Sequence, residues 1–304
     1  MTKQELTNMV AEILSQMHGT QQPMVKGSDY KTLVLEPDQK DGHYHEGDFV
    51  PDVTALDLRK LYLTENAADA EKFKKMKLKT PARLGCGKAG ARYKTLTMLR
   101  FRADHAAAQD AVFSEMDADF AKQHDLLPVK TRCGTKDEYL TRPDLGRCFD
   151  EHNAKTIKGV IDTPPRVQIV VGDGLSSAAI AANAMDCLAA IRDGLKLRGI
   201  ETGKAIFVKY CRVGAGDAIG DITGCELVCV LVGERPGLVT DKSMSAYITY
   251  KPHTGVSESS RTVVSNIHAQ GTPAVEAGAH VAELIDKILK KKVSGVGLHL
   301  GDGA

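Results

Sequence analysis

The spacing of apolar residues along the chain changes near residue 155. Before this point the patterns are helical, and in segment 91–113 one helix face collects Leu96, Leu99, Ala103, Ala106 and Phe113. After it, short apolar runs alternate with helical stripes. Strands are predicted at 167–171, 205–210, 226–232 and 245–250, and helices at 176–197 and 273–292. This alternation favours a parallel, Rossmann-like α/β domain at residues 151–304, preceded by a helical N-terminal domain at residues 55–150.

Residues 1–20 carry a pattern of their own. Thr2 and Glu5 form a capping box, and a stripe of apolar residues from Leu6 to Met17 predicts an amphipathic leader helix. Residues 21–54 are rich in Gly, Pro, Asp, His and Lys, which predicts a flexible linker. Since a short isolated helix is marginally stable in water, the leader is expected to dock, either on another protein or back on its own domain.

The segment VQIVVGDGLSSAAIAAN (167–183) predicts a strand, a glycine turn and a helix. Gly172 and Gly174 allow close approach of another group, and Ser176 can cap the helix. Ligands of open parallel sheets bind at the carboxyl ends of the strands, so a ligand is expected near this turn. LVGERPG (231–237) places Glu234 and Arg235 at a similar strand end. These two side chains either contact a ligand or pair with each other or with a neighbouring chain, and the sequence leaves both open.

Neither glycine-rich segment matches a dinucleotide-binding fingerprint. GDGLSS (172–177) has Ser in place of the third glycine, and GAGDAIG (214–220) is expected to leave no room for a crossover helix before the next strand. The chain has no GxSxG motif, and no cysteine has an evident activating neighbour. His268, in a polar loop, is predicted to be a loop hydrogen-bonder. The sequence therefore predicts no catalytic residue.

Composition narrows the possible partners. The 304 residues carry a net charge of +1, with 42% hydrophobic and 26% charged residues, which is typical of a soluble globular protein and argues against nucleic-acid binding. No apolar run approaches the roughly 20 residues that cross a bilayer, so no membrane association is expected. The seven cysteines are scattered and form no CxxC pair, which predicts a reducing, cytoplasmic location and no metal site.

Six blocks of sequence resemble the light chain (small subunit) of ethanolamine ammonia-lyase. In chain order they are CGKAGARYKTLTMLRFRADHAAAQDAV, YLTRPDLGR, VVGDGLSSAAI, FVKYCRV, LVGERPG and SNIHAQGTPAVEA, and they cover roughly residues 83 to 292. The resemblance implies a lyase that uses adenosylcobalamin and radical chemistry to convert ethanolamine to acetaldehyde and ammonia. In that family the large subunit supplies the substrate pocket and the small subunit closes over the cobalamin. A hetero-oligomer is therefore expected, and the missing catalytic set is explained because the cofactor and the other chain supply the chemistry.

The resemblance also implies three cofactor-binding residues. Val213 matches a valine that lies against the cobalamin, and Glu234 matches a glutamate whose carboxylate accepts hydrogen bonds from it. The third family position is commonly a cysteine and is Val263 here, so no thiol is required. Whether Arg212, Arg235 or Asp173 contacts the cofactor or the partner chain is left open.

The resemblance also implies a location for the protein. Ethanolamine lyases are commonly packaged in bacterial microcompartments, so residues 1–20 are expected to address the chain to the shell. The alternative is a non-catalytic α/β binding or scaffold module for another phosphate-bearing ligand, held by the loops at 172–176 and 233–237.

Overall fold

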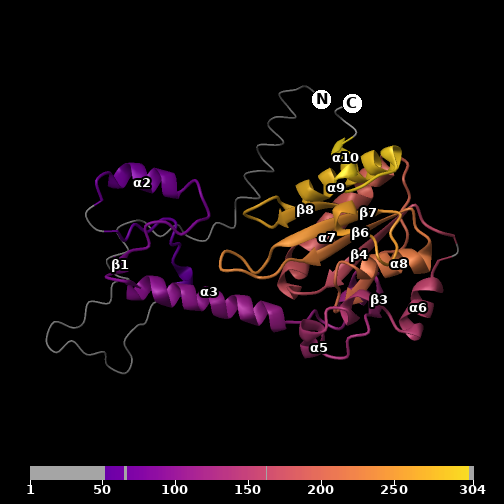
Figure 1. The fold of residues 1–304 in the computed structure, drawn as a ribbon, viewed down its shortest axis with the longest axis horizontal. Helices are drawn as coiled ribbons and strands as arrows, with labels where there is room; N and C mark the ends of the chain where they lie inside the picture. Colours follow the sequence, from indigo (N-terminus) through magenta and orange to yellow (C-terminus); the bar gives the residue numbers. More distant parts are fainter. Residues whose placement is uncertain (1–51, 65–66, 162, 301–304) are drawn as a thin grey trace. The chain divides into compact units, whose positions relative to one another are not determined.

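A six-stranded sheet forms the core of the larger compact unit, Asp57–Ala304 (Figure 1). The computed structural model describes residues 52–64, 67–161 and 163–300, so the predicted leader helix and residues 21–51 of the predicted linker lie outside the described residues. The strands are β3 (Leu127–Lys130), β4 (Val167–Asp173), β5 (Ile206–Lys209), β6 (Leu227–Gly233), β7 (Met244–Tyr250) and β8 (Arg261–Ile267). Their spatial order is β3-β5-β4-β6-β7-β8. The first four run parallel, whereas β7 is antiparallel to both β6 and β8. The predicted α/β class with a mainly parallel sheet is confirmed.

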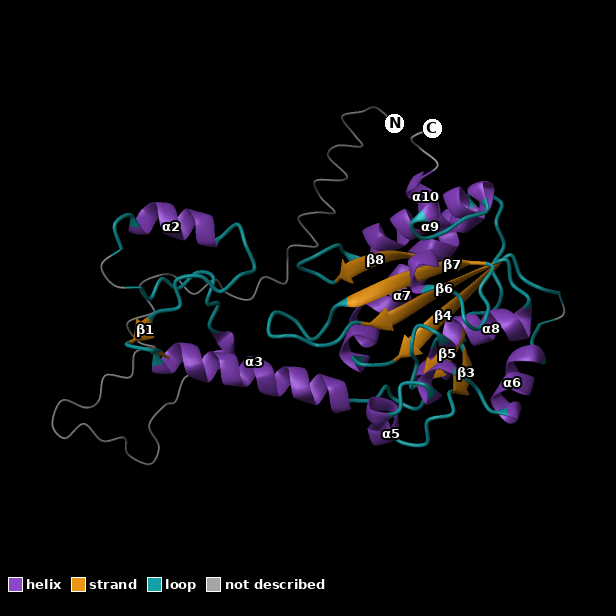
Figure 2. Ribbon diagram, in the orientation of Figure 1, coloured by secondary structure: helices purple, strands orange, loops and turns teal. Residues whose placement is uncertain are grey.

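Helices cover both faces of this sheet (Figure 2). The longest are α7 (Ser177–Lys196) and α9 (Ala274–Lys291), which pack together on one face, while α6 (Glu151–Lys158) and α8 (Ala215–Thr223) cover part of the other. Side chains alternate along β4 between the two layers: Ile169 and Val171 join the α7 and α9 layer, and Val170 joins the α8 layer. A strand buried on both faces reads as a continuous apolar run, which is why β4 was predictable.

The remaining described elements are short apart from α3. They are η3 (Val53–Ala55), α2 (Ala70–Lys77), β1 (Lys88–Ala89), β2 (Arg92–Tyr93), α3 (Thr95–Phe113), α4 (Phe120–Gln123), α5 (Lys136–Thr141), η4 (Leu145–Arg147), η5 (Glu258–Ser260) and α10 (Gly297–Leu300). All except η3 belong to one compact unit, Asp57–Ala304. Across the described ranges, we find no helix with the length and apolar character needed to span a bilayer.

Two strands at the edges of the sheet were not predicted. β3 is a four-residue edge strand that contains Pro128, and its register with β5 places it in the main sheet. The predicted boundary near residue 150 therefore does not coincide with the edge of the sheet. β8, the opposite edge strand, has polar and half-exposed positions because only part of one face is covered. Edge strands bury less surface, so their apolar signal is weak.

The expectation of no crossover helix between β5 and β6 is wrong, because α8 occupies this connection. Its glycines allow close packing instead of breaking the helix. A Cβ at Gly216 would lie 2.6 Å from the Val230 side chain, and one at Gly220 would lie 2.5 Å from the carbonyl oxygen of Pro252. Gly224, with φ of 67°, ends the helix in the left-handed conformation. The nine-residue helix fits because its glycines bring it against the sheet.

Candidate functional site

The carboxylate of Glu234 is held by three elements that meet at one end of the sheet. Glu234 follows β6, and its backbone N–H donates to the carbonyl of Ser243, just before β7, at 2.8 Å. Its Oε2 accepts from the Ser243 hydroxyl at 2.9 Å, and its Oε1 accepts from the Ser245 hydroxyl at 2.5 Å. Oε1 also accepts from the backbone N–H of Asn266, at the end of β8, at 3.0 Å. The carboxylate is thus surrounded by the turn after β6, the start of β7 and the end of β8.

These donors keep Glu234 ionised. Burial by itself would raise its pKa, but the Asn266 N–H and the hydroxyls of Ser245 and Ser243 outweigh it, so the net pKa lies below the usual value. A carboxylate can accept about four hydrogen bonds, and from the residues that the structure describes Oε1 accepts two and Oε2 accepts one. Since Glu234 is half-buried, Oε2 keeps an acceptor position for a donor from outside the chain.

The loop after β8 fixes the Asn266 N–H in place. Asn266 has a φ of 62°, in the left-handed region, and its carbonyl accepts from the N–H of Thr272 at 3.0 Å. His268 Nδ1 accepts from the N–H of Gln270 at 3.2 Å, and Nε2 donates to Asn266 Oδ1 at 2.8 Å, because an amide oxygen can only accept. A Cβ at Gly271 would lie 2.3 Å from the Asn266 carbonyl oxygen. His268 therefore has the loop hydrogen-bonding role that the sequence indicates.

Val263 and Tyr247 form an apolar surface beside this carboxylate. In the sheet register Val263 of β8 lies opposite Tyr247 of β7, which lies opposite Val230 of β6. Ser245 and Tyr247 are two residues apart, so both side chains point to the α8 face. Val263 is 45% exposed, although it lies within a strand. Burial, and then the negative charges of Glu234 and Glu258, raise the pKa of Tyr247. On this face of the sheet, an exposed apolar patch thus lies beside the ionised carboxylate of Glu234.

Val213 lies in the loop between β5 and α8, and β5 is on the far side of β4 from β6, the strand that Glu234 follows. It is half-buried and packs against the same hydrophobic cluster as Tyr247. The preceding residue, Arg212, fixes the segment: its N–H donates to the Gly146 carbonyl at 2.9 Å, and its guanidinium lies 4.2 Å from the centre of the Tyr139 ring. The structure therefore brings Glu234 and Val263 into one patch and places Val213 along the same layer without direct contact.

The glycine turn after β4 contacts the chain itself. A Cβ at Gly172 would lie 2.7 Å from Cys211 Sγ, and one at Gly174 would lie 2.7 Å from the Cys211 carbonyl oxygen. Asp173 accepts from the Ser177 hydroxyl at 2.6 Å and from the Met116 N–H at 3.1 Å. The exposed fractions of Asp173 and Ser177 are 1% and 3%. The group that approaches these glycines is therefore the loop after β5. Asp173 is too deeply buried to contact a ligand.

Arg235 differs from its neighbour in being exposed. Within the described part of the chain, no ion pair joins Arg235 to Glu234, whose carboxylate instead accepts from Ser243, Ser245 and Asn266. The interpretation in which the two charges pair across the turn is therefore not supported.

The residues that hold the Glu234 carboxylate were not predicted from the sequence. Ser243 and Ser245 are small polar residues two positions apart at the start of a predicted strand, a spacing that puts both on one face. Asn266 acts through its backbone, which leaves no signal in its side-chain type. Among the described residues, no group of three or more His, Cys, Asp or Glu side chains is placed to hold a metal ion.

Fold and site together define an α/β protein whose sheet presents a half-open patch, an ionised acid beside apolar residues, at one end of its strands. The chain belongs to the ethanolamine ammonia-lyase light chain family (EutC), whose sequence model matches residues 70–299. The resemblance found in the sequence is thereby confirmed.

Curated relatives are similar over nearly the whole chain. The ethanolamine ammonia-lyase small subunit of Clostridium perfringens is 54% identical over 298 residues, which cover 98% of this chain and 100% of that protein. The protein of the same name from Clostridioides difficile is 60% identical over 249 residues, 82% of this chain and 85% of that protein. The Listeria innocua protein is 52% identical over 298 residues, 98% of this chain and 100% of its own length.

Proposed function

We propose that this chain is the small subunit of an adenosylcobalamin-dependent ethanolamine ammonia-lyase, which converts ethanolamine to acetaldehyde and ammonia as a carbon–nitrogen lyase. The chain works in a hetero-oligomer with a large subunit. Family membership supports the assignment, and the relatives carry the same subunit name. The observation that carries the cofactor role is the Glu234 carboxylate, ionised and with one acceptor position open, beside the exposed Val263.

The residues present suit a corrinoid. The open Oε2 position of Glu234 can accept a hydrogen bond from an amide or hydroxyl at the edge of the cofactor. Val263 and the ring of Tyr247 offer apolar contact to a flat macrocycle, and Val213 extends that contact along the α8 face. When bound, adenosylcobalamin supplies the radical that removes hydrogen from the substrate. This chain binds and orients the cofactor and excludes water from it, while the large subunit holds ethanolamine.

The location follows the same assignment. We place the enzyme in the bacterial cytoplasm, within the microcompartments used for ethanolamine catabolism, with residues 1–20 addressing the chain to the shell. Deleting these residues should leave the two-chain enzyme assembled and active but outside the shell fraction. Unchanged encapsulation would refute this role for the leader.

The test of the cofactor role is Glu234→Ala in the complex co-expressed with the large subunit. Cobalamin affinity, measured by equilibrium dialysis, is expected to fall about tenfold or more, because one charge-assisted hydrogen bond is lost. The far-ultraviolet circular dichroism and the subunit ratio should stay unchanged. Glu201→Ala is the matched control, since it removes an exposed carboxylate from the loop between α7 and β5, away from the proposed site. Equal cobalamin affinity in Glu234→Ala and the unmodified complex would remove Glu234 from the site.

The competing hypothesis is a binding module for another phosphate-bearing ligand, held by the loops at 172–176 and 233–237. Burial of Asp173, Ser176 and Ser177 argues against the first of these loops, because those side chains offer a phosphate no exposed donor. In a co-purification experiment this hypothesis requires the chain to remain free of the large subunit. Stable co-purification in a defined ratio would exclude it.

A further inference from the structure

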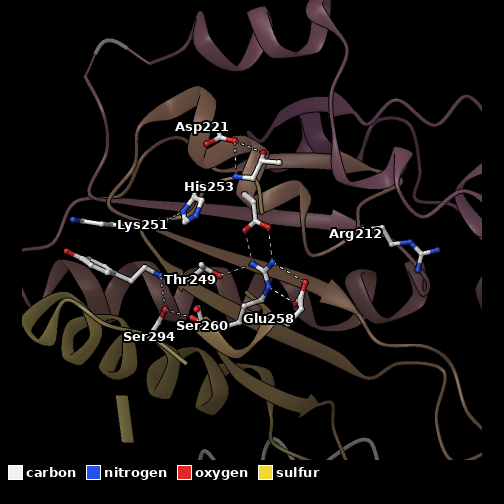
Figure 3. Close-up of polar contacts among 12 residues, drawn as sticks. Arg212, Asp221, Thr249, Lys251, His253, Glu258, Ser260 and Ser294 are labelled. Carbon is white, nitrogen blue, oxygen red and sulfur yellow. Dashed lines mark hydrogen bonds and ion pairs between the residues drawn. The ribbon is translucent and has the colours of Figure 1, made fainter. Parts of the chain in front are cut away.

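All five N–H donors of Arg261, the first residue of β8, are satisfied within the fold. Two of the residues that accept from it, Thr249 and Glu258, are labelled in Figure 3. Nη1 and Nη2 donate to the two carboxylate oxygens of Asp217, each at 2.8 Å. Nη1 also donates to the Thr249 hydroxyl at 3.2 Å, and Nε and Nη2 donate to Glu258 at 2.7 and 3.2 Å. A guanidinium that forks onto one carboxylate fixes both distance and orientation.

The ion pair between Arg261 and Asp217 joins strand β8 to helix α8. Asp217 lies in the first turn of α8, four residues after Val213, whereas Arg261 lies two residues before Val263. Their side chains are only 8% and 3% exposed. A buried ion pair of this kind need not increase stability, since apolar residues of similar volume often stabilise a protein equally well. The forked contact does fix the distance and orientation between the two side chains. The pair therefore sets the spacing between the segments that carry Val213 and Val263.

Strand β8 is held at both ends, with Val263 exposed between them. At its start, the Ser294 hydroxyl donates to the Ser260 carbonyl at 2.5 Å, on the face opposite Arg261. At its far end, the N–H of Asn266 donates to Glu234 at 3.0 Å. An edge strand pairs with the sheet on one side only, so such end contacts decide where its middle lies.

We propose that Arg261 is a positioning residue for the cofactor half-site. Its fork onto Asp217 holds β8 against α8, so that Val263 and Val213 meet the same bound corrinoid. This inference rests on the proposed function, because it takes both valines as contacts of the cofactor. Arg261 itself is enclosed by Asp217, Thr249 and Glu258 and does not touch the cofactor.

The experiment uses the complex with the large subunit and two variants of the pair. Arg261→Lys keeps the positive charge but cannot form the fork. Arg261→Met combined with Asp217→Leu removes both charges, so no unpaired charge is left buried. In both variants the Kd and the KM for adenosylcobalamin should rise about tenfold, as when residues behind a metal ligand are replaced. The kcat at saturating cofactor should stay unchanged, because no group at the reacting atoms is altered.

Stability is separated from positioning by a matched control. Ile191→Val removes one methylene from the fully buried core of α7, and its urea midpoint should fall, as that of Arg261→Lys is expected to do. Its affinity for adenosylcobalamin should not change. Unaltered affinity in both Arg261 variants, or an equal loss in Ile191→Val, would overturn the proposal. If the double variant does not assemble, Arg261→Lys decides alone.

The same series distinguishes this inference from the proposed function. If Glu234→Ala leaves cobalamin affinity unchanged, the cofactor site itself is wrongly placed. If Glu234→Ala weakens binding and the Arg261 variants do not, the site stands and only the positioning role fails.

Discussion

The backbone N–H of Asn266 donates to Oε1 of Glu234 at 3.0 Å, joining the end of β8 to the loop that follows β6. Two strands that do not pair with each other are thus connected through one carboxylate, across the start of β7. The contact depends on an unusual backbone conformation, since Asn266 has a φ of 62°. Local strain of this kind persists only where the surroundings hold it, and here Thr272 and His268 do so.

Replacing Asn266 tests this conformation. Asn266→Val should destabilise the chain by about 1–3 kcal/mol, because a β-branched residue is strained at positive φ. Asn266→Gly accepts the same backbone conformation and keeps the N–H on Glu234, so its loss should be smaller, although it also removes the His268 contact. Urea unfolding of both variants measures the difference. Equal midpoints for Val and Gly would mean that the left-handed conformation does not matter here.

The hydroxyls of Ser245 and Ser243 help the Asn266 N–H to lower the pKa of Glu234. Because folding lowers the pKa of Glu234, its contribution to stability is present above the pKa of the unfolded chain and is lost as pH falls through the folded pKa. Removing both hydroxyls, as Ser243→Ala with Ser245→Ala, should raise the folded pKa, so that the loss begins at a higher pH. At neutral pH we expect a cost of about 1 kcal/mol, since solvent screens a half-buried acid.

A pH series of urea unfolding, together with an NMR titration of the Glu234 carboxyl carbon, checks this expectation. Ser257→Ala is a suitable control, because Ser257 is an exposed serine whose hydroxyl contacts only Ser259 among the described residues. An unchanged titration midpoint for Glu234 in the double variant would show that the serines do not set its charge.

The central strands were predictable because each is buried on both faces. β4 and β6 are buried at every position, and the predicted ranges 167–171 and 226–232 differ from the observed strands by one or two residues. β8 was not predicted because it is an edge strand with an irregular apolar pattern. Val263 is exposed, and the N–H of Asn266 donates to the side chain of Glu234 instead of to a neighbouring strand. The features that hide β8 from sequence analysis are those that make it part of the candidate site.

The glycines were predictable as special positions, but their partners were not. Gly172 and Gly174 indicate close approach by another group, and only the fold shows that this group is the loop containing Cys211. A sequence pattern predicts contacts within one segment, whereas this contact joins residues nearly 40 positions apart. Glu234 was predictable because a charged residue directly after an apolar strand is conspicuous in the sequence. Its serine and backbone donors carry no such signal.

The packing of α8 against Pro252 gives a test in which two effects oppose each other. Gly220→Ala should favour the helix by roughly 1 kcal/mol through propensity, since Ala is the better helix former. The added Cβ would lie 2.5 Å from the Pro252 carbonyl oxygen and 2.6 Å from its ring, which is closer than atoms can approach. Overpacking of this kind costs about 1–3 kcal/mol or more, so the variant should be destabilised overall. Gly237→Ala, where a new Cβ meets nothing within 4 Å, should leave the urea midpoint nearly unchanged. A Gly220→Ala variant as stable as the unmodified chain would show that α8 can move away from Pro252, and the short crossover would then not depend on its glycines.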